Sequence, residues 1–442
     1  MRFFSTRDSS NVTNFKNAVM DCMPQDGGLY VPEDMADLRR WILYADENTS
    51  FASLAGALTS AMINDEFSPL ICEAIATRAF SIDPVFRQLD ENFFYLELYN
   101  GATGTFKDYG VSYLTATLET ILQMDGEKAI LLDSTCGELG ACMSKAMKDK
   151  KLLKSVLLYP KGKIRGLDQS DFVWNGGNIF PVEVEGTEED CRNMVRKIFA
   201  DRELVKKYNL TVANTANIGR LLPQSFFYTN AFSRLKKKVN GDIFYAFPAG
   251  NYGNLISGLY SWRQALPVNG FMVPATSRIT LDAKGNCMMM DSMVPVEKRE
   301  PADPADPSNI ERLEQVFKAN SLMLRSFVFP ATVTEEDTVQ ACKELFMKYK
   351  IYADHDTSAA YACAKKRMAA TTDGDAVLVL VARESPSMDG DFLRKTLGEC
   401  PVMSQNVAKA FTPVTLDRPC LEPGDIEGLK LILNSLNLRR LF

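Results

Sequence analysis

From about residue 93 onward, the sequence alternates between short β-rich runs and longer amphipathic stretches. The first pair is the run Phe93–Tyr99, followed by a helical pattern from Asp108 to Leu122. Alternation of this kind is typical of βαβ units, whose strands form a parallel sheet, so we predict an α/β protein. Further strands are predicted at Ala129–Leu132, Val156–Tyr159, Leu210–Ala213, Ile243–Phe247, Phe271–Val273 and Ala376–Val381.

The length of 442 residues exceeds the size at which a single hydrophobic core stops growing, so we expect two domains with a terminal extension. The first 90 residues lack the alternation, and residues 35–80 show helical patterns. We predict an N-terminal cap at 1–90, a smaller α/β domain at 91–225 and a larger one at 226–442. The Pro-, Asp- and Glu-rich stretch Val294–Ser308 predicts an exposed insertion near 290–308.

Composition favours small-molecule chemistry. The formal net charge is -6 and the basic residues are dispersed, which argues against a nucleic-acid or anionic-membrane partner. No stretch approaches the roughly 20 apolar residues of a membrane span, and the start lacks a signal peptide, so we expect a cytoplasmic protein. The ten cysteines form no CxxC pair and His355 is the single histidine, which argues against a zinc or His-rich metal site.

The segment Gly101–Gly110 (GATGTFKDYG) lies between a predicted strand and a predicted helix, which places Lys107 at a helix N-terminus. The helix dipole disfavours a positive charge there, so we expect a depressed pKa for Lys107 and a role as amine nucleophile and base. A solvated lysine in the first turn, beside a favourably placed Asp108, explains the spacing equally well.

Two further strand-to-helix loops are rich in glycine. Gly250–Asn254 follows a predicted strand and precedes a helical run, an arrangement in which free amides and the helix dipole bind a phosphate dianion. The alternative is a turn that simply requires glycine. Ser134–Gly140 occupies the same position in an earlier unit, and its amides are candidates to hold a substrate carboxylate.

Together these segments resemble the threonine synthases, whose lysine motif reads GPTxxFKDxG where this chain has GATGTFKDYG. The resemblance continues in the same order through Pro24–Glu33, Tyr159–Lys163, Asn214–Gln224 (NTANIGRLLPQ against NSxNWARxLPQ) and Gly250–Asn254 (GNYGN against GNFGN). It covers most of the chain. It implies the fold of type II pyridoxal-phosphate enzymes, which is like that of the tryptophan synthase β chain, with the cofactor in the cleft between two α/β domains.

The resemblance also implies an activity and a site. Lys107 is expected to hold pyridoxal 5'-phosphate as a Schiff base, and the reaction is expected to convert O-phosphohomoserine and water to threonine and phosphate. The implied protein acts as a monomer or homodimer. Cofactor contacts are expected from Lys107, Gly250, Asn251, Tyr252, Gly253, Asn254 and Ser385. Substrate contacts are expected from Thr135, Cys136, Gly137, Lys161, Lys163, Asn217 and Arg220, of which the three cations are candidates for the substrate phosphate.

The chain departs from the family pattern in loops expected to touch the ligands. The family's SGDTG stands here as Cys136–Gly140 (CGELG), which replaces two hydroxyls with a thiol and an isobutyl group. The family's DPHTA stands as Asp354–Ser358 (DHDTS), so His355 falls one position early and is not taken as the family histidine.

A third departure concerns the pyridine nitrogen of the cofactor. The family's TAHP corresponds to Arg383–Pro386 (RESP), which puts Arg383 where a neutral hydroxyl normally stands. An arginine there keeps the ring nitrogen unprotonated and weakens the electron sink. Ser385 or Ser387 restores a neutral partner if the register shifts.

These departures leave two alternatives open. One is a lyase that eliminates phosphate and releases a 2-oxo acid and ammonia without adding water. The other is a catalytically degenerate binding protein that keeps the fold. The intact Lys107 and Asp108 argue against the second.

Overall fold

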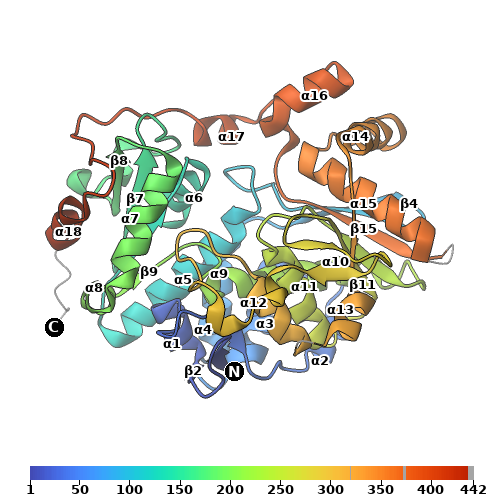
Figure 1. Ribbon diagram of the computed structural model, residues 1–442, viewed down its shortest axis with the longest axis horizontal. Helices are drawn as coiled ribbons and strands as arrows, with labels where there is room; N and C mark the ends of the chain where they lie inside the picture. The colour runs from blue at the N-terminus through green and yellow to red at the C-terminus, as the bar shows by residue number, and fades with distance from the viewer. Residues whose placement is uncertain (319, 372–374, 437–442) are drawn as a thin grey trace.

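The computed structural model describes residues 1–318, 320–371 and 375–436. Two sheets organise the chain (Figure 1): a six-stranded sheet in the order β14-β11-β10-β15-β5-β4 and a four-stranded sheet in the order β8-β7-β6-β9. Neighbouring strands are parallel except for the pair β4 and β5. The predicted α/β architecture with parallel sheets is confirmed.

Helices cover both faces of the larger sheet. Alternate residues of one strand point to opposite faces: Phe94 and Leu96 join one core cluster, while Phe93 and Tyr95 join another. The first core includes α10 (Ser225–Leu235) and α11 (Gly253–Arg263), and the second includes α14 (Glu335–Tyr349) and α15 (His355–Thr371). The strands are β4 (Val85–Asp90), β5 (Phe93–Glu97), β10 (Ile243–Ala246), β11 (Gly270–Pro274), β14 (Val328–Ala331) and β15 (Val377–Ala382).

The smaller sheet consists of β6 (Ala129–Ser134), β7 (Leu153–Pro160), β8 (Ile179–Val184) and β9 (Leu210–Thr211). Helix α5 (Lys107–Asp125) precedes β6 and packs against α6 (Glu138–Ala146), which connects β6 to β7, while α7 (Glu188–Ala200) and α8 (Arg202–Tyr208) connect β8 to β9. Although β5 precedes this unit in sequence, it belongs to the larger sheet, because it pairs with β15 from near the end of the chain. The predicted boundary at residue 91 therefore does not follow the sheets, since an alternation of patterns carries no information about such distant pairing.

The first 80 residues, within the predicted cap of 1–90, carry elements of their own, whereas β4 at 85–90 pairs in the larger sheet. A three-stranded antiparallel sheet is followed by helices that pack on α5 and α10. Ser50 and Ser68 cap two of these helices by accepting hydrogen bonds from backbone amides. The elements are β1 (Arg2–Ser5), β2 (Val12–Asn14), α1 (Phe15–Asp21), β3 (Tyr30–Pro32), α2 (Arg39–Tyr44), α3 (Phe51–Ile63) and α4 (Pro69–Ala79).

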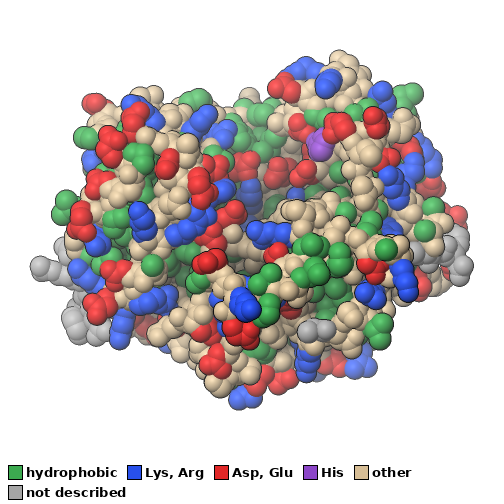
Figure 2. Space-filling view, viewed as in Figure 1, with side chains coloured by type: hydrophobic (Ala, Val, Ile, Leu, Met, Phe, Trp, Pro, Cys, Tyr) green, Lys and Arg blue, Asp and Glu red, His purple; other side chains and the backbone are tan. Residues whose placement is uncertain are grey.

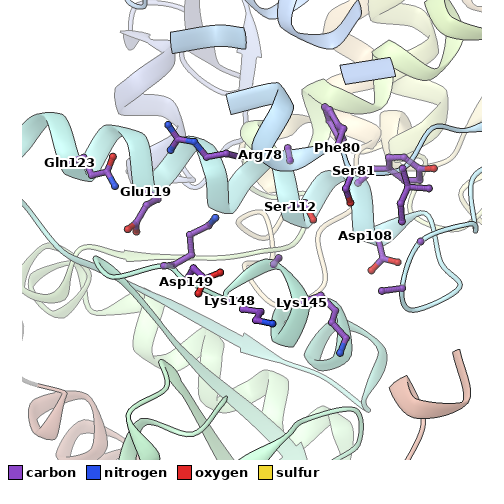
Figure 3. Close-up of a pocket in the computed structure, with 17 residues that line it drawn as sticks. Arg78, Phe80, Ser81, Asp108, Ser112, Glu119, Gln123, Lys145, Lys148 and Asp149 are labelled. Carbon is purple, nitrogen blue, oxygen red and sulfur yellow. The ribbon is translucent and has the colours of Figure 1, made fainter. Parts of the chain in front are cut away.

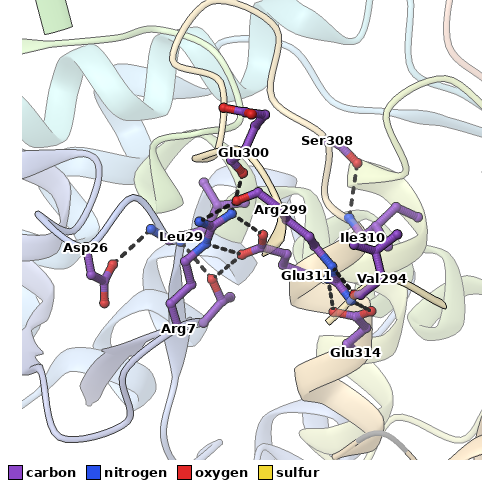
Figure 4. A network of polar contacts seen from close by, with 12 residues as sticks. Arg7, Asp26, Leu29, Val294, Arg299, Glu300, Ser308, Ile310, Glu311 and Glu314 are labelled. Carbon is purple, nitrogen blue, oxygen red and sulfur yellow. Dashed lines mark hydrogen bonds and ion pairs between the residues drawn. The ribbon is translucent and has the colours of Figure 1, made fainter. Parts of the chain in front are cut away.

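The predicted insertion runs between a short hairpin, β12 (Ile279–Leu281) and β13 (Cys287–Met289), and α12 (Ile310–Phe317). It is fastened to the cap and to its own helix (Figure 4). Arg7 pairs with Glu311 at 2.7 Å and donates to the carbonyl of Glu300 at 2.5 Å, and Arg299 pairs with Glu314 at 2.7 Å. The segment is exposed over much of its length, and these contacts hold it as a strap against the cap and α12.

The C-terminal segment passes from the larger sheet to the smaller one (Figure 1). After α13 (Ser321–Phe327), β14, α14, α15 and β15 come α16 (Gly390–Leu397), α17 (Gln405–Ala410) and α18 (Ile426–Ser435). Leu429 and Leu433 of α18 are fully buried in the core of the smaller sheet. The predicted domain at 226–442 therefore contributes to both sheet units, because its last helix packs on the smaller sheet. Among the helices of the described chain, none has the length and apolar character needed to cross a bilayer.

A fully buried arginine joins the cap, the strap and the segment before α9 (Ile218–Leu221). Arg312 donates to the carbonyls of Tyr30, Thr215 and Ala216 at 3.0, 2.5 and 2.9 Å and to Asn309 Oδ1 at 2.7 Å. Burial lowers the pKa of Arg312 to about 10, which leaves it charged at neutral pH. Backbone carbonyls from two segments and one side-chain amide oxygen thus solvate one cation.

We expect Arg312→Met to destabilise the protein by about 3 kcal/mol, because it leaves several buried carbonyls without donors. The melting temperature measures this effect. Arg2→Met is the matched control, since Arg2 is 67% exposed and pairs only at the surface with Glu33. Equal melting temperatures for both variants would contradict the role assigned to Arg312.

Candidate functional site

The loops singled out in the sequence follow the carboxyl ends of strands from both sheets. The Lys107 loop follows β5, the Thr135–Gly140 loop follows β6, the Gly250–Asn254 loop follows β10, and Arg383 follows β15. In α/β folds this edge of a parallel sheet is where ligands bind. Figure 2 shows the molecule hollowed between the two sheet units, with acidic side chains gathered along the hollow.

Lys107 lies between two carboxylates. It is the first residue of α5, as predicted, and its Nζ forms an ion pair with Glu138 at the start of α6. Glu384 Oε1 lies 3.9 Å from Nζ on the other side. Burial alone lowers the pKa of Lys107, but the two carboxylates outweigh it and raise the pKa above its ordinary value. The expected depression by the helix dipole is therefore wrong for the cofactor-free chain, because the sequence did not place these acids.

Asp108 fixes the shape of the loop that presents Lys107. Its carboxylate accepts hydrogen bonds from the amide and the hydroxyl of Thr103, at 2.9 and 2.8 Å. A Cβ at Gly101 would lie 2.1 Å from this carboxylate, so the turn requires glycine. The loop is also tied to the end of β15, where the amide of Phe106 donates to the carbonyl of Arg383 at 2.8 Å. The turn that carries Lys107 is thus fixed by the Asp108–Thr103 contacts and by its hydrogen bond to the end of β15.

The Gly250–Asn254 loop offers free backbone amides. Gly250 has φ 69° and Tyr252 has φ 62°, and α11 begins at Gly253. Among the described residues, the amides of Gly250, Asn251 and Tyr252 have no hydrogen-bond acceptor. The side chain of Asn251 is held by Thr215 Oγ1 at 2.9 Å. Free amides at the N-terminus of a helix suit a phosphate dianion, so the residues present fit the phosphate of pyridoxal phosphate.

Two arginines approach the ring of Phe106, the residue before Lys107. The guanidinium carbons of Arg220 and Arg383 lie 5.8 and 5.6 Å from its centroid. Arg383 is 12% exposed, and its Nη1 reaches Ala249 O at 3.4 Å and Asn254 Oδ1 at 3.5 Å. Within the described chain, Nη1 of Arg220 and Nε of Arg383 are buried without a partner. Both cations therefore have donors available for an anion.

A cavity of about 480 Å³ opens beside Lys107. Acidic side chains predominate in its lining, which also includes the arginine Arg165. The guanidinium of Arg165 donates to Cys136 O at 3.1 and 2.6 Å and lies over the ring of Phe411. Sequence reasoning passed over Arg165, although it stands two residues after Lys163 in the same segment. The acidic residues of the lining are Glu138, Asp354, Asp356, Glu384 and Asp389.

The predicted substrate lysines do not line this cavity. Lys161 pairs with Glu185 at 2.6 Å and is 58% exposed, and Lys163 is also exposed. Asn217 is fully buried: its amide donates to Val19 O and Thr211 Oγ1, and its oxygen caps α9. These hydrogen bonds give Asn217 a structural role, and it does not line the cavity.

The remaining predicted residues lie around the hollow. Thr135 Oγ1 accepts from the amide of Gly137 at 2.9 Å, while Cys136 is exposed. Gly137 has φ 131°, and a Cβ there would collide with Arg165. Ser385 lines the cavity and shares a 2.9 Å hydrogen bond with Ser387.

His355 lines the same cavity, and its ring contacts Glu335 at 2.9 Å. Burial alone would lower the pKa of His355, but the neighbouring carboxylates outweigh it and raise the pKa above its usual range. Its ring is thus held among acids at the rim of the hollow.

Comparison with known proteins agrees with this geometry. A family model described as "Pyridoxal-phosphate dependent enzyme" matches residues 74–383, and one described as "Threonine synthase N terminus" matches residues 2–80. A threonine synthase of Buchnera aphidicola is 29% identical over 78% of this chain and 81% of its own length. The crystal structure of threonine synthase from Escherichia coli superposes with a TM-score of 0.77 at 25% identity, covering 98% of this chain and 100% of the other.

The fold likeness extends to a structure with the cofactor. The PLP-bound threonine synthase from Brucella melitensis superposes with a TM-score of 0.80 at 21% identity, covering 98% of this chain and 99% of the other. At that identity the match supports the fold.

We expect Glu138→Gln to speed the capture of pyridoxal phosphate by the cofactor-free protein. Removing the carboxylate lowers the pKa of Lys107, so more of its amine is neutral at a given pH and able to attack an aldehyde. The rate of appearance of the visible absorbance of the lysine-bound cofactor, measured over a pH series, should shift its midpoint to lower pH. Glu185→Gln, which removes the partner of Lys161, is the control and should leave the profile in place. A profile that is identical in Glu138→Gln and wild type would overturn the assigned effect.

Proposed function

Starting from a chain that belongs to the pyridoxal-phosphate dependent enzymes and, among them, to the threonine synthase family, we propose that it converts O-phosphohomoserine and water to threonine and phosphate. One observation carries the proposal. Lys107 lies at the start of α5 in the same hollow as the free amides of Gly250–Tyr252, which are suited to a phosphate. The amine and the anion site are the two anchors that this cofactor needs.

When bound, pyridoxal phosphate supplies the electron sink for the carbanions of this reaction. Lys107 Nζ is proposed to hold the cofactor at rest and, once the substrate amine displaces it, to carry protons to and from the substrate carbons. Glu138 is positioned to keep Nζ protonated or to accept its proton, since the two groups form an ion pair in the cofactor-free chain. The amides of Gly250, Asn251 and Tyr252 are proposed to fix the cofactor phosphate.

The substrate phosphate requires a cationic partner away from the acidic wall of the cavity. Arg220 suits this role because its Nη1 is unpartnered among the described residues and Asp108 lies nearby without pairing with it. Burial lowers the pKa of Arg220 to about 10, which still leaves the side chain charged at neutral pH. Arg165 at the cavity is the second candidate. A dianionic leaving group beside Glu138 and Glu384 alone would be repelled.

A lyase that releases a 2-oxo acid, ammonia and phosphate is the second candidate. The segment at the start of α6 supports this second reaction, because it lacks two hydroxyl groups of the family pattern. Leu139 packs against the main core, and Cys136 is an exposed thiol, so neither supplies the hydroxyl that the family pattern has. Weaker hydrogen bonding there would leave the attacking water less well oriented.

Incubation of the holoenzyme with O-phosphohomoserine tests the proposal. We expect threonine and phosphate in equal amounts, measured by chromatography of the amino acids and by a phosphate assay. A 2-oxo acid and ammonia in place of threonine would establish the lyase. Release of no phosphate from a fully loaded holoenzyme would overturn both.

A second prediction concerns the charge of Arg383. Its guanidinium lies against the Gly250–Asn254 loop, 3.0 Å from where a Cβ of Gly250 would be. A fixed cation there disfavours protonation of the bound cofactor, so Arg383→Thr should raise the pH at which the visible absorbance of the resting holoenzyme titrates. Arg418→Thr is the control, because Arg418 stacks on Trp174 in the smaller sheet unit. An unshifted titration in Arg383→Thr would remove Arg383 from the cofactor's surroundings.

A further inference from the structure

A second cavity, of about 470 Å³, lies along α5 next to the Lys107 loop (Figure 3). One wall is α5 itself, with Asp108, Ser112, Glu119 and Gln123 along its length. The end of α4 and the segment after it form a second wall, and residues 145–150 at the end of α6 form a third. Its volume lies within the range of small-molecule sites. The sequence analysis and the proposed reaction leave it without a role.

The cavity carries four cations, and among the described residues none of them forms a side-chain hydrogen bond or ion pair. Arg78 stands on one wall, and Lys145, Lys148 and Lys150 stand on the opposite one. Figure 3 shows Arg78 on the side of α5 and Lys145 and Lys148 across the gap from it. Burial lowers the pKa of the half-buried Lys150 despite the opposing effect of Glu119, and the like charge of Arg78 adds to the lowering. An anion between these walls would relieve this repulsion.

The acidic groups of the lining are largely engaged elsewhere. Glu119 is 4% exposed and accepts hydrogen bonds from the amides of Lys151 and Leu152, at 2.8 and 3.2 Å. Asp108 accepts from Thr103, and burial raises its pKa. Asp149 alone offers an uncommitted carboxylate within the described lining. The cavity therefore presents an excess of available positive charge.

The same cavity borders the residues that shape the Lys107 loop. Gly101 and Ala102 begin that loop, and Asp108 fixes it through Thr103. Tyr109 also lines the cavity; it is 4% exposed, and within the described chain its hydroxyl has no partner. A ligand here would contact the turn that sets the position of Lys107, and it would bridge the cap to the end of α6.

We propose that this cavity binds a small phosphorylated anion and that its occupancy is felt at Lys107 through Asp108 and the turn Gly101–Ala102. Lysines serve as point charges for phosphate, and three of them face one arginine across a space of suitable size. The apolar side chains of Phe80 and Ile82 complete the walls and suit an organic portion of the ligand. The site is separate from the proposed substrate position and does not depend on which reaction the enzyme performs.

Calorimetric titration of the holoenzyme with inorganic pyrophosphate, and separately with citrate, tests the site at constant ionic strength. We expect Lys145→Gln/Lys148→Gln to weaken pyrophosphate binding by about tenfold or more, because two charge-assisted contacts are lost. The matched control is Lys237→Gln/Lys238→Gln, which removes the same charge from exposed positions after α10. It should bind as wild type does. If citrate bound as tightly as pyrophosphate, the proposed phosphorylated ligand would be wrong and a polycarboxylate would take its place as the ligand class.

The visible absorbance of the bound cofactor provides the second readout. Pyrophosphate should shift it in wild type and in the control pair but not in Lys145→Gln/Lys148→Gln. Equal affinities for pyrophosphate in all three proteins, or no binding of pyrophosphate to wild type, would contradict the proposed binding site. Binding without a spectral change would overturn the link to Lys107. A failure of the proposed reaction leaves the calorimetry unaffected, so the two proposals fail separately.

Discussion

The ion pair between Lys107 and Glu138 joins the two sheet units across the hollow. Lys107 belongs to the larger sheet through its loop, since the amide of Phe106 donates to Arg383 at the end of β15, 2.8 Å away. Glu138 opens the helix that follows β6 of the smaller sheet. Each partner is about 30% exposed, so the pair is only partly screened by solvent. The contact couples the position of Lys107 Nζ to the relative placement of the two units, and an aldehyde that binds Nζ would compete with it.

The other charged residues of the site lie in two groups around this ion pair. Glu138, Glu384 and three further acids line one cavity, whereas Arg220 and Arg383 approach the ring of Phe106. Both arginines have buried donors that no described group satisfies. Unsatisfied buried donors cost stability, and such groups persist where a ligand completes them. The phosphate of the cofactor is one such anion, and the phosphate of the proposed substrate is a second.

The sequence predicted those parts of the fold that local patterns determine. The strands β6, β7, β10, β11 and β15 and the start of α5 were predicted from periodicity, and the loops that follow β6, β10 and β15 contribute to the candidate site. Pairing between distant strands left no local pattern, so β5 was assigned to the wrong sheet unit, and the crossing of α18 to the smaller sheet was missed. The raised pKa of Lys107 was missed for the same reason: Glu138 and Glu384 reach Nζ from two other loops. Asn217 was chosen because it belongs to the segment Asn214–Gln224, but its side chain is buried and caps a helix. Arg165 lies two residues beyond the segment Tyr159–Lys163, so it was not chosen, yet it lines the cavity.

The central claim is that Lys107 is the residue that binds pyridoxal phosphate. Borohydride reduction of the holoenzyme, followed by proteolysis and peptide mass spectrometry, tests it directly, because reduction makes the lysine–cofactor bond permanent. We expect one phosphopyridoxyl group per chain, on the peptide that contains Lys107, with Lys161 and Lys163 unmodified. A stoichiometric adduct on any other lysine, with Lys107 free, would contradict it.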